Sequence, residues 1–84
     1  MKLHFSASAW EDYLYWQAQD EKMLTRVNAL IKDCTRSPFQ GIGKPELLRG
    51  NLSGWWSRRI DLEHRLVYRV EAEALLIAQA KYCY

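Results

Sequence analysis

The chain has 84 residues, of which 49% are hydrophobic, 26% charged and 13% aromatic, and its formal net charge is +2. This length predicts one domain over residues 1–84 with one modest core, and the apolar content excludes a disordered chain. The chain has no apolar stretch of about 18 residues, so no membrane span is expected, and its start lacks the apolar run of a signal peptide. The spacing of Cys34 and Cys83 indicates neither a metal site nor a disulfide framework, which favours a cytoplasmic protein.

The first half of the chain predicts a strand followed by two helices. Residues 2–5 are expected to form the strand. Ser6 is a suitable N-cap for the first helix, and Asp20 for a second helix that Ser37-Pro38 ends. The second helix has an apolar stripe at helical spacing, formed by Leu24, Val27, Leu30, Ile31 and Cys34.

The second half predicts strands. Glycines and prolines indicate a loop over residues 38–54, with a short extended piece at 45–48. Strands are expected at residues 55–60, 65–70 and 74–82, with turns at 61–64 and 71–73 between them. The predicted fold class is therefore α+β, a short first strand and two helices followed by an antiparallel meander that packs on the helices.

Side-chain alternation divides each strand between a helix-facing and an open side. We expect Arg59, Arg65 and Lys81 on the open side and Arg58 on the other. In the last strand one face is formed by Leu76, Ala78, Ala80 and Tyr82, and the opposite face by Gln79, Lys81 and Cys83.

The aromatic residues are expected to be mostly structural. Trp10, Tyr13 and Trp16 lie on or near the inner stripe of the first helix, which predicts that they are in the core. Trp55 and Trp56 are neighbours on one strand, so one of them should face inward and the other outward.

The cationic residues concentrate in the second half. Residues 1–42 contain five basic and five acidic side chains, whereas residues 44–69 contain six basic and three acidic ones, a balance of +3. Five of those six cations are arginines, whose forked donors suit phosphate groups. The open side of the sheet is therefore a candidate RNA-binding surface.

Several strings of residues point to a known family. They are Asp12-Tyr13-Leu14-Tyr15-Trp16, Pro38-Phe39, Gly43-Lys44-Pro45-Glu46, Asn51-Leu52-Ser53-Gly54, Trp56-Ser57-Arg58-Arg59-Ile60, Glu63-His64-Arg65-Leu66-Val67-Tyr68 and Tyr82-Cys83-Tyr84. With the order of the predicted elements, these strings resemble the YoeB (Txe/YoeB) toxins of type II toxin–antitoxin systems, in the RelE/ParE superfamily. The resemblance runs through the whole chain and implies a RelE-like microbial ribonuclease fold.

The resemblance also implies a reaction. Such toxins bind the ribosome and cut messenger RNA in the decoding site, without a metal or another cofactor. The ribose 2′-hydroxyl attacks the adjacent phosphate and the chain breaks at the 5′-oxygen. This chemistry needs a general base, a cation for the charge of the transition state and a general acid.

The resemblance assigns these roles to particular residues. Glu46 matches the general base, Arg65 the residue that stabilises transition-state charge, and Tyr84 the residue that positions the substrate. From its own surroundings, Glu46 would be an ordinary exposed loop glutamate. The cations expected to bind the RNA backbone are Lys44, Arg49 and Arg59.

Position 83 departs from the family pattern. The family usually ends in Tyr-His-Tyr, with histidine as general acid, whereas this chain ends in Tyr82-Cys83-Tyr84. A thiol is a weak donor and cannot carry the charge of an imidazolium, so we expect weakened cleavage. His64 is not expected to replace it, because adjacent strand residues such as His64 and Arg65 alternate in direction.

The resemblance implies three kinds of partner, namely a YefM-like antitoxin, the ribosome with its message, and a second copy of the chain. Two other functions stay open at this stage. One is an inert module that binds antitoxin or ribosome without cutting RNA. The other is a ParE-like gyrase inhibitor, which Glu46, Arg65 and Tyr84 argue against.

Overall fold

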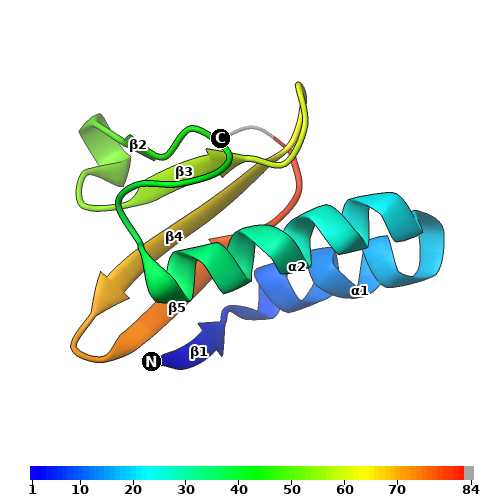
Figure 1. Ribbon diagram of the computed structural model, residues 1–84, viewed down its shortest axis with the longest axis horizontal. Coiled ribbons are helices and arrows are strands. Elements are labelled where there is room, and N and C mark those ends of the chain that lie inside the picture. Colours follow the sequence, from blue (N-terminus) through cyan, green and yellow to red (C-terminus); the bar gives the residue numbers. More distant parts are fainter. Residues whose placement is uncertain (83–84) are drawn as a thin grey trace.

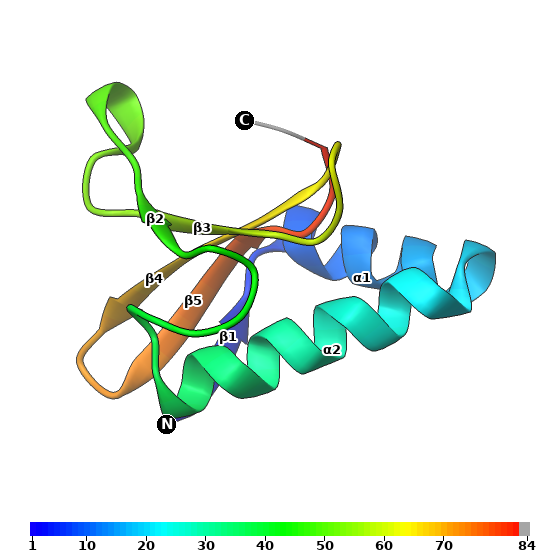
Figure 2. The same cartoon turned by 45° about the horizontal axis from the view of Figure 1, so that its top comes forward.

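Two helices cover one face of a single mixed sheet in the computed structural model, which describes residues 1–82 (Figures 1 and 2). Along the chain the elements are β1 (Lys2–Phe5), α1 (Ala7–Gln19), α2 (Glu21–Arg36), β2 (Glu46–Leu47), a short 3₁₀ turn (Gly50–Leu52), β3 (Trp56–Arg59), β4 (Arg65–Glu71) and β5 (Ala74–Gln79). The strand order is β1-β5-β4-β3-β2, with β1 parallel to β5 and the other pairs antiparallel. The α+β prediction is confirmed.

The helices begin and end where their capping residues predict. The Ser6 hydroxyl accepts a hydrogen bond from the Ala9 N–H at 3.0 Å, and the Asp20 carboxylate accepts one from the Met23 N–H at 3.2 Å. Asp20 ends α1 and caps α2, and α2 stops at Arg36, before Ser37-Pro38. Within residues 1–82, neither helix combines the length and apolar composition needed to cross a membrane.

The core lies between the apolar stripe of α2 and the helix-facing side of the sheet. It is formed by residues that include Val27, Leu30, Cys34, Leu66, Tyr68, Leu75 and Ile77, all at most 1% exposed. Each such large apolar side chain stabilises the fold by about 1.5–3 kcal/mol relative to an exposed position. Burial raises the pKa of the Cys34 thiol to about 11, so this thiol is protonated and inert, as predicted for a core cysteine.

The aromatic residues of α1 only partly follow the prediction. Trp16 is buried in the core, but Trp10 is 48% exposed, so the prediction that it is a core residue is wrong. Trp10 stacks on Tyr13 at 5.6 Å between ring centroids and meets the edge of Phe5 at the rim of the sheet. The sheet ends at β1, so no further strand lies beyond it to cover Trp10.

The last strand also differs from the prediction. β5 ends at Gln79 instead of residue 82, and Leu75 and Ile77 fill the core where Leu76 was expected to face the helices. A register shift between Val67 and Tyr68 in β4 interrupts the pairing with β5. Simple alternation therefore fails along this strand.

Lys81 is not on the open side of the sheet, which corrects a third prediction. Its ammonium group lies 3.6 Å from the centre of the Tyr15 ring on α1. The chain has left the strand at Gln79, so the alternation of β5 no longer sets the direction of this side chain. The cation instead gains a cation–π contact at the helix surface.

Candidate active site

The pairing of β2, β3 and β4 brings predicted site residues onto one face. Glu46 pairs with Ser57, Ser57 pairs with Val67, and Arg59 pairs with Arg65. Directly paired residues of an antiparallel sheet lie on the same side. Glu46, Arg59 and Arg65 therefore share the face of the sheet opposite the helices, the open face, which is turned upward in Figure 2.

Arg65 is the first residue of β4, and its side chain packs on the turn of residues 61–64 that precedes it. Its Nη1 donates to the backbone carbonyls of Asp61 at 2.9 Å and His64 at 3.1 Å, with a longer contact of 3.4 Å to Leu62. The turn is shaped by the Asp61 carboxylate, which accepts hydrogen bonds from the N–H groups of Glu63 and His64. The guanidinium is thus held by backbone groups in one orientation, which suits a residue that must meet developing charge.

Asp61 is ionised in this turn. Burial acts to raise the pKa of its carboxyl, but the N–H groups of His64 and Glu63 outweigh burial and hold the pKa below its ordinary value. The turn therefore carries a fixed negative charge beside Arg65.

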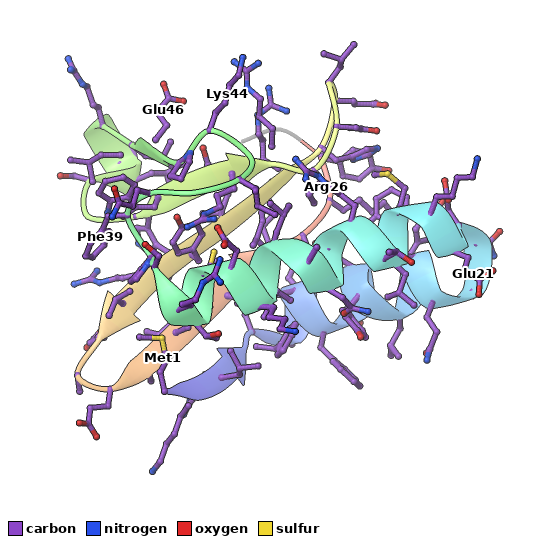
Figure 3. All side chains as sticks on the ribbon, viewed as in Figure 1. Met1, Glu21, Arg26, Phe39, Lys44 and Glu46 are labelled. Carbon is purple, nitrogen blue, oxygen red and sulfur yellow. The ribbon has the colours of Figure 1, made fainter. Side chains whose placement is uncertain are left out.

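Glu46 lies on a two-residue edge strand. The segment before it is attached to β3 by a hydrogen bond of 2.7 Å from the Arg59 N–H to the Gly43 carbonyl. Lys44 follows with a positive φ of 52°, and Figure 3 shows the Lys44 and Glu46 side chains pointing away from the helices. Lys44, Glu46 and Arg49 are all exposed, so this edge presents a carboxylate and two cations to solvent.

Arg58 is a buried structural residue, in contrast to Arg59 and Arg65 on the open face. Its side chain is fully buried on the helix side of the sheet, as alternation predicts. The guanidinium donates to acceptors from three parts of the chain, the Asp33 carboxylate, the Tyr68 hydroxyl and the carbonyls of Ser37, Gln40 and Ile42. We call Asp33, Arg58 and Tyr68 the buried hub.

The buried hub holds the loop of residues 37–43 that leads to Glu46. The Tyr68 hydroxyl donates to the Pro38 carbonyl at 2.6 Å, and the Ile42 N–H donates to Asp33 at 3.1 Å. The loop passes so close that a Cβ on Gly41 would meet the Asp33 carboxylate at 2.1 Å, and φ there is +129°. Both the space and the backbone angle require glycine.

Sequence reasoning missed this hub. Its one signal was an aspartate inside the apolar stripe of α2, at position 33 beside Cys34, together with an arginine at an inward strand position. The partners come from elements 25 residues apart, and strand alternation alone does not say which charge will meet Arg58.

Acid unfolding is expected to depend on Asp33. The Arg58 guanidinium, then Arg36 and the Ile42 N–H, lower the pKa of its carboxyl from 3.8 to about 2. The unfolded chain binds the proton more tightly, so the stabilisation is complete above 3.8 and is lost as the pH falls toward 2. Melting temperatures across this range should show a shallower acid decline for Asp33→Asn, which keeps an oxygen acceptor. An identical decline in both chains would contradict this.

Two predicted site residues cannot be placed. Cys83 and Tyr84 lie outside the described residues, while Tyr82 before them accepts a hydrogen bond of 3.0 Å from the Arg65 N–H at its carbonyl oxygen. Within residues 1–82, no three His, Cys, Asp or Glu side chains gather closely enough to hold a metal ion.

Comparison with a distant solved structure concerns the fold. A toxin from Helicobacter pylori has the same fold, with a TM-score of 0.70 at 20% identity over 98% of this chain and 93% of that one. At this level of identity the likeness shows a shared fold alone.

Closer similarities define the family. Residues 5–84 match the model for YoeB-like toxins of bacterial type II toxin–antitoxin systems. The toxin YoeB of Escherichia coli strain K12 is 57% identical, and that of Streptomyces coelicolor 52% identical, each over the full length of both chains. A YoeB/ParE toxin from Agrobacterium tumefaciens has a TM-score of 0.98 at 46% identity, again over both full chains. The chain belongs to the YoeB-like toxins of type II toxin–antitoxin systems.

Proposed function

We propose that this toxin is a ribosome-dependent endoribonuclease that cuts messenger RNA in the bacterial cytoplasm. The observation that carries the proposal is the strand register that places Glu46 on the same open face as Arg59 and Arg65. A carboxylate and two guanidinium groups on one face, of which that of Arg65 is held by backbone carbonyls, supply a base and cations for phosphodiester chemistry.

In the proposed reaction, the Glu46 carboxylate takes the proton of a ribose 2′-hydroxyl. The 2′-oxygen forms a bond to the adjacent phosphorus, the bond from phosphorus to the 5′-oxygen breaks, and a 2′,3′-cyclic phosphate remains. Arg65 stabilises the charge that develops on the phosphate oxygens. Cys83 stands at the position that gives a proton to the leaving 5′-oxygen, and Tyr84 orients the substrate.

The neighbouring cations support binding of the RNA backbone. Lys44, Arg49 and Arg59 are exposed, as Glu46 is. Their contacts with phosphates would raise affinity without reading bases, and would weaken as salt increases. Neutralising any one of them is therefore expected to reduce binding to all messages alike.

Primer extension on a ribosome-bound message tests the proposal. The native chain and a Cys83→His variant are each incubated with programmed ribosomes and with naked message. A new RNA end that appears only with ribosomes, and that disappears on Glu46→Gln in the Cys83→His background, is expected. Absence of cutting by both chains would refute the nuclease proposal.

A binding role has separate support. A relative from Staphylococcus aureus, 48% identical with a TM-score of 0.92, was solved as a heterotetrameric YoeB–YefM toxin–antitoxin complex, and another structure from that organism is described as a YoeB dimer. We propose a YefM-like antitoxin as the partner of this chain, and a homodimer when the antitoxin is absent. An acidic antitoxin segment would complement the cations around Glu46.

Co-purification with a YefM-like antitoxin, followed by light scattering for mass, tests this partnership. A stable complex formed by a chain that cuts no message, even after Cys83→His, would favour an inert binding module over a nuclease. Failure to form a complex would count against the antitoxin as a partner.

A further inference from the structure

The last described residues follow a path set by side chains of α1. Both backbone groups of Ala80 are bonded to this helix. The Trp16 indole Nε1 donates to the Ala80 carbonyl at 2.7 Å, and the Asp12 carboxylate accepts from the Ala80 N–H at 3.0 Å. Residues four apart on a helix lie on one face. One turn of α1 therefore provides hydrogen-bond partners for both the N–H and the carbonyl of Ala80.

The backbone of Tyr82 is also held at both its N–H and its carbonyl, by residues outside α1. Its N–H donates to His64 Nδ1 at 2.7 Å, and its carbonyl accepts from the Arg65 N–H at 3.0 Å and from the Gln79 amide at 2.9 Å. Accepting at Nδ1 requires that nitrogen to be unprotonated, so the proton of a neutral ring lies on Nε2. Nε2 in turn lies 3.5 Å from a Glu63 carboxylate oxygen.

The two sets of contacts are joined. The Trp16 ring packs edge-on against the His64 ring, with centroids 4.9 Å apart. Tyr15, the residue before Trp16 on α1, has its ring centre 3.6 Å from the Lys81 ammonium. Each of the three described residues after β5 is therefore bound by a side chain from α1 or from the turn before β4.

The backbone of residues 80–82 does not continue the strand. β5 stops at Gln79, and Tyr82 takes a positive φ of 64° that a continuing strand would not have. Side chains, in place of the regular strand ladder, fix the path of residues 80–82. The path ends at the main-chain N–H of Arg65, the residue assigned to transition-state charge.

We propose that Asp12, Trp16 and His64 are positioning residues that hold residues 80–82 against Arg65. They thereby keep the backbone of Arg65, the residue assigned to transition-state charge, in place. This inference rests on the proposed nuclease function for its purpose, but its structural content can be tested without it. It also gives a role to part of the string Asp12-Tyr13-Leu14-Tyr15-Trp16.

Amide hydrogen exchange, followed by NMR on the full chain, tests the anchoring itself. Asp12→Ala removes the acceptor of the Ala80 N–H, whereas Asp12→Asn keeps one. His64→Phe keeps a ring against Trp16 but removes the acceptor of the Tyr82 N–H. The matched control is Tyr13→Phe, which removes a hydrogen bond of 2.8 Å to Asn28 from the same helix.

The Ala80 amide is expected to exchange at least about tenfold faster in Asp12→Ala than in Asp12→Asn or Tyr13→Phe. The Tyr82 amide should respond in the same way to His64→Phe, while the Tyr68 amide in β4 stays within about twofold of its native rate. Equal exchange in all four variants would overturn the anchoring, and a faster Tyr68 amide would indicate general loosening instead.

Cleavage kinetics in the Cys83→His background test the purpose of the anchoring. A displacement of about 1 Å at a reacting group can cost about a hundredfold in rate. Asp12→Ala and His64→Phe should lower kcat without changing KM for programmed ribosomes, and Asp12→Asn should restore kcat. An unchanged kcat would overturn the positioning role. If Cys83→His alone cuts no message, the nuclease proposal fails, and the exchange rates decide the anchoring by themselves.

Discussion

Replacing Arg58 by methionine is expected to lower the free energy of unfolding by about 3–5 kcal/mol, the range for removing one partner of a buried ion pair. Arg58 is fully buried and bonded to Asp33, to Tyr68 and to the carbonyls of the loop 37–43. Methionine fills part of the volume but leaves these acceptors without their donor. Denaturant unfolding followed by tryptophan fluorescence measures the change.

Arg59→Met is the matched control, because the next residue of the same strand is exposed. Its effect should stay within about 0.5 kcal/mol. A double variant, Arg58→Met with Asp33→Leu, should recover part of the loss, since no lone carboxylate is then left. A loss below about 1 kcal/mol for Arg58→Met would contradict the view that the buried hub holds the fold together.

Cys83→His is expected to raise the rate of message cleavage by about 10²–10⁴-fold, the usual contribution of general acid catalysis. An imidazolium donates its proton near neutral pH and brings positive charge to the leaving oxygen. A thiol is a weak proton donor and carries no positive charge. Single-turnover cleavage on programmed ribosomes separates this chemical step from binding.

Cys83→Gln provides the control for this gain. Glutamine is polar and of similar reach to histidine, but it cannot act as a proton donor of the required acidity. Its cleavage rate should remain at or below that of the native chain. A gain with glutamine equal to that with histidine would show that side-chain size, and not acid catalysis, limits the native chain.

Local signals in the sequence determined the secondary structure. Ser6 and Asp20 cap the two helices, and Ser37-Pro38 ends the second one, because each of these effects acts within a few residues. Alternation placed Arg58 inward and Arg59 and Arg65 on the open face, since β3 and the start of β4 pair regularly. The position of Glu46 on the same face was expected from the resemblance alone.

Only the tertiary structure decided how distant segments meet. The register shift in β4 placed Leu75 and Ile77 in the core, and the end of β5 at Gln79 turned Lys81 toward Tyr15. The buried hub and the contacts of α1 with residues 80 and 81 join positions far apart in the chain, through geometry that no periodicity encodes. A sequence pattern reports on which side of its own element a residue lies. Which residue it contacts on that side depends on how the elements pack.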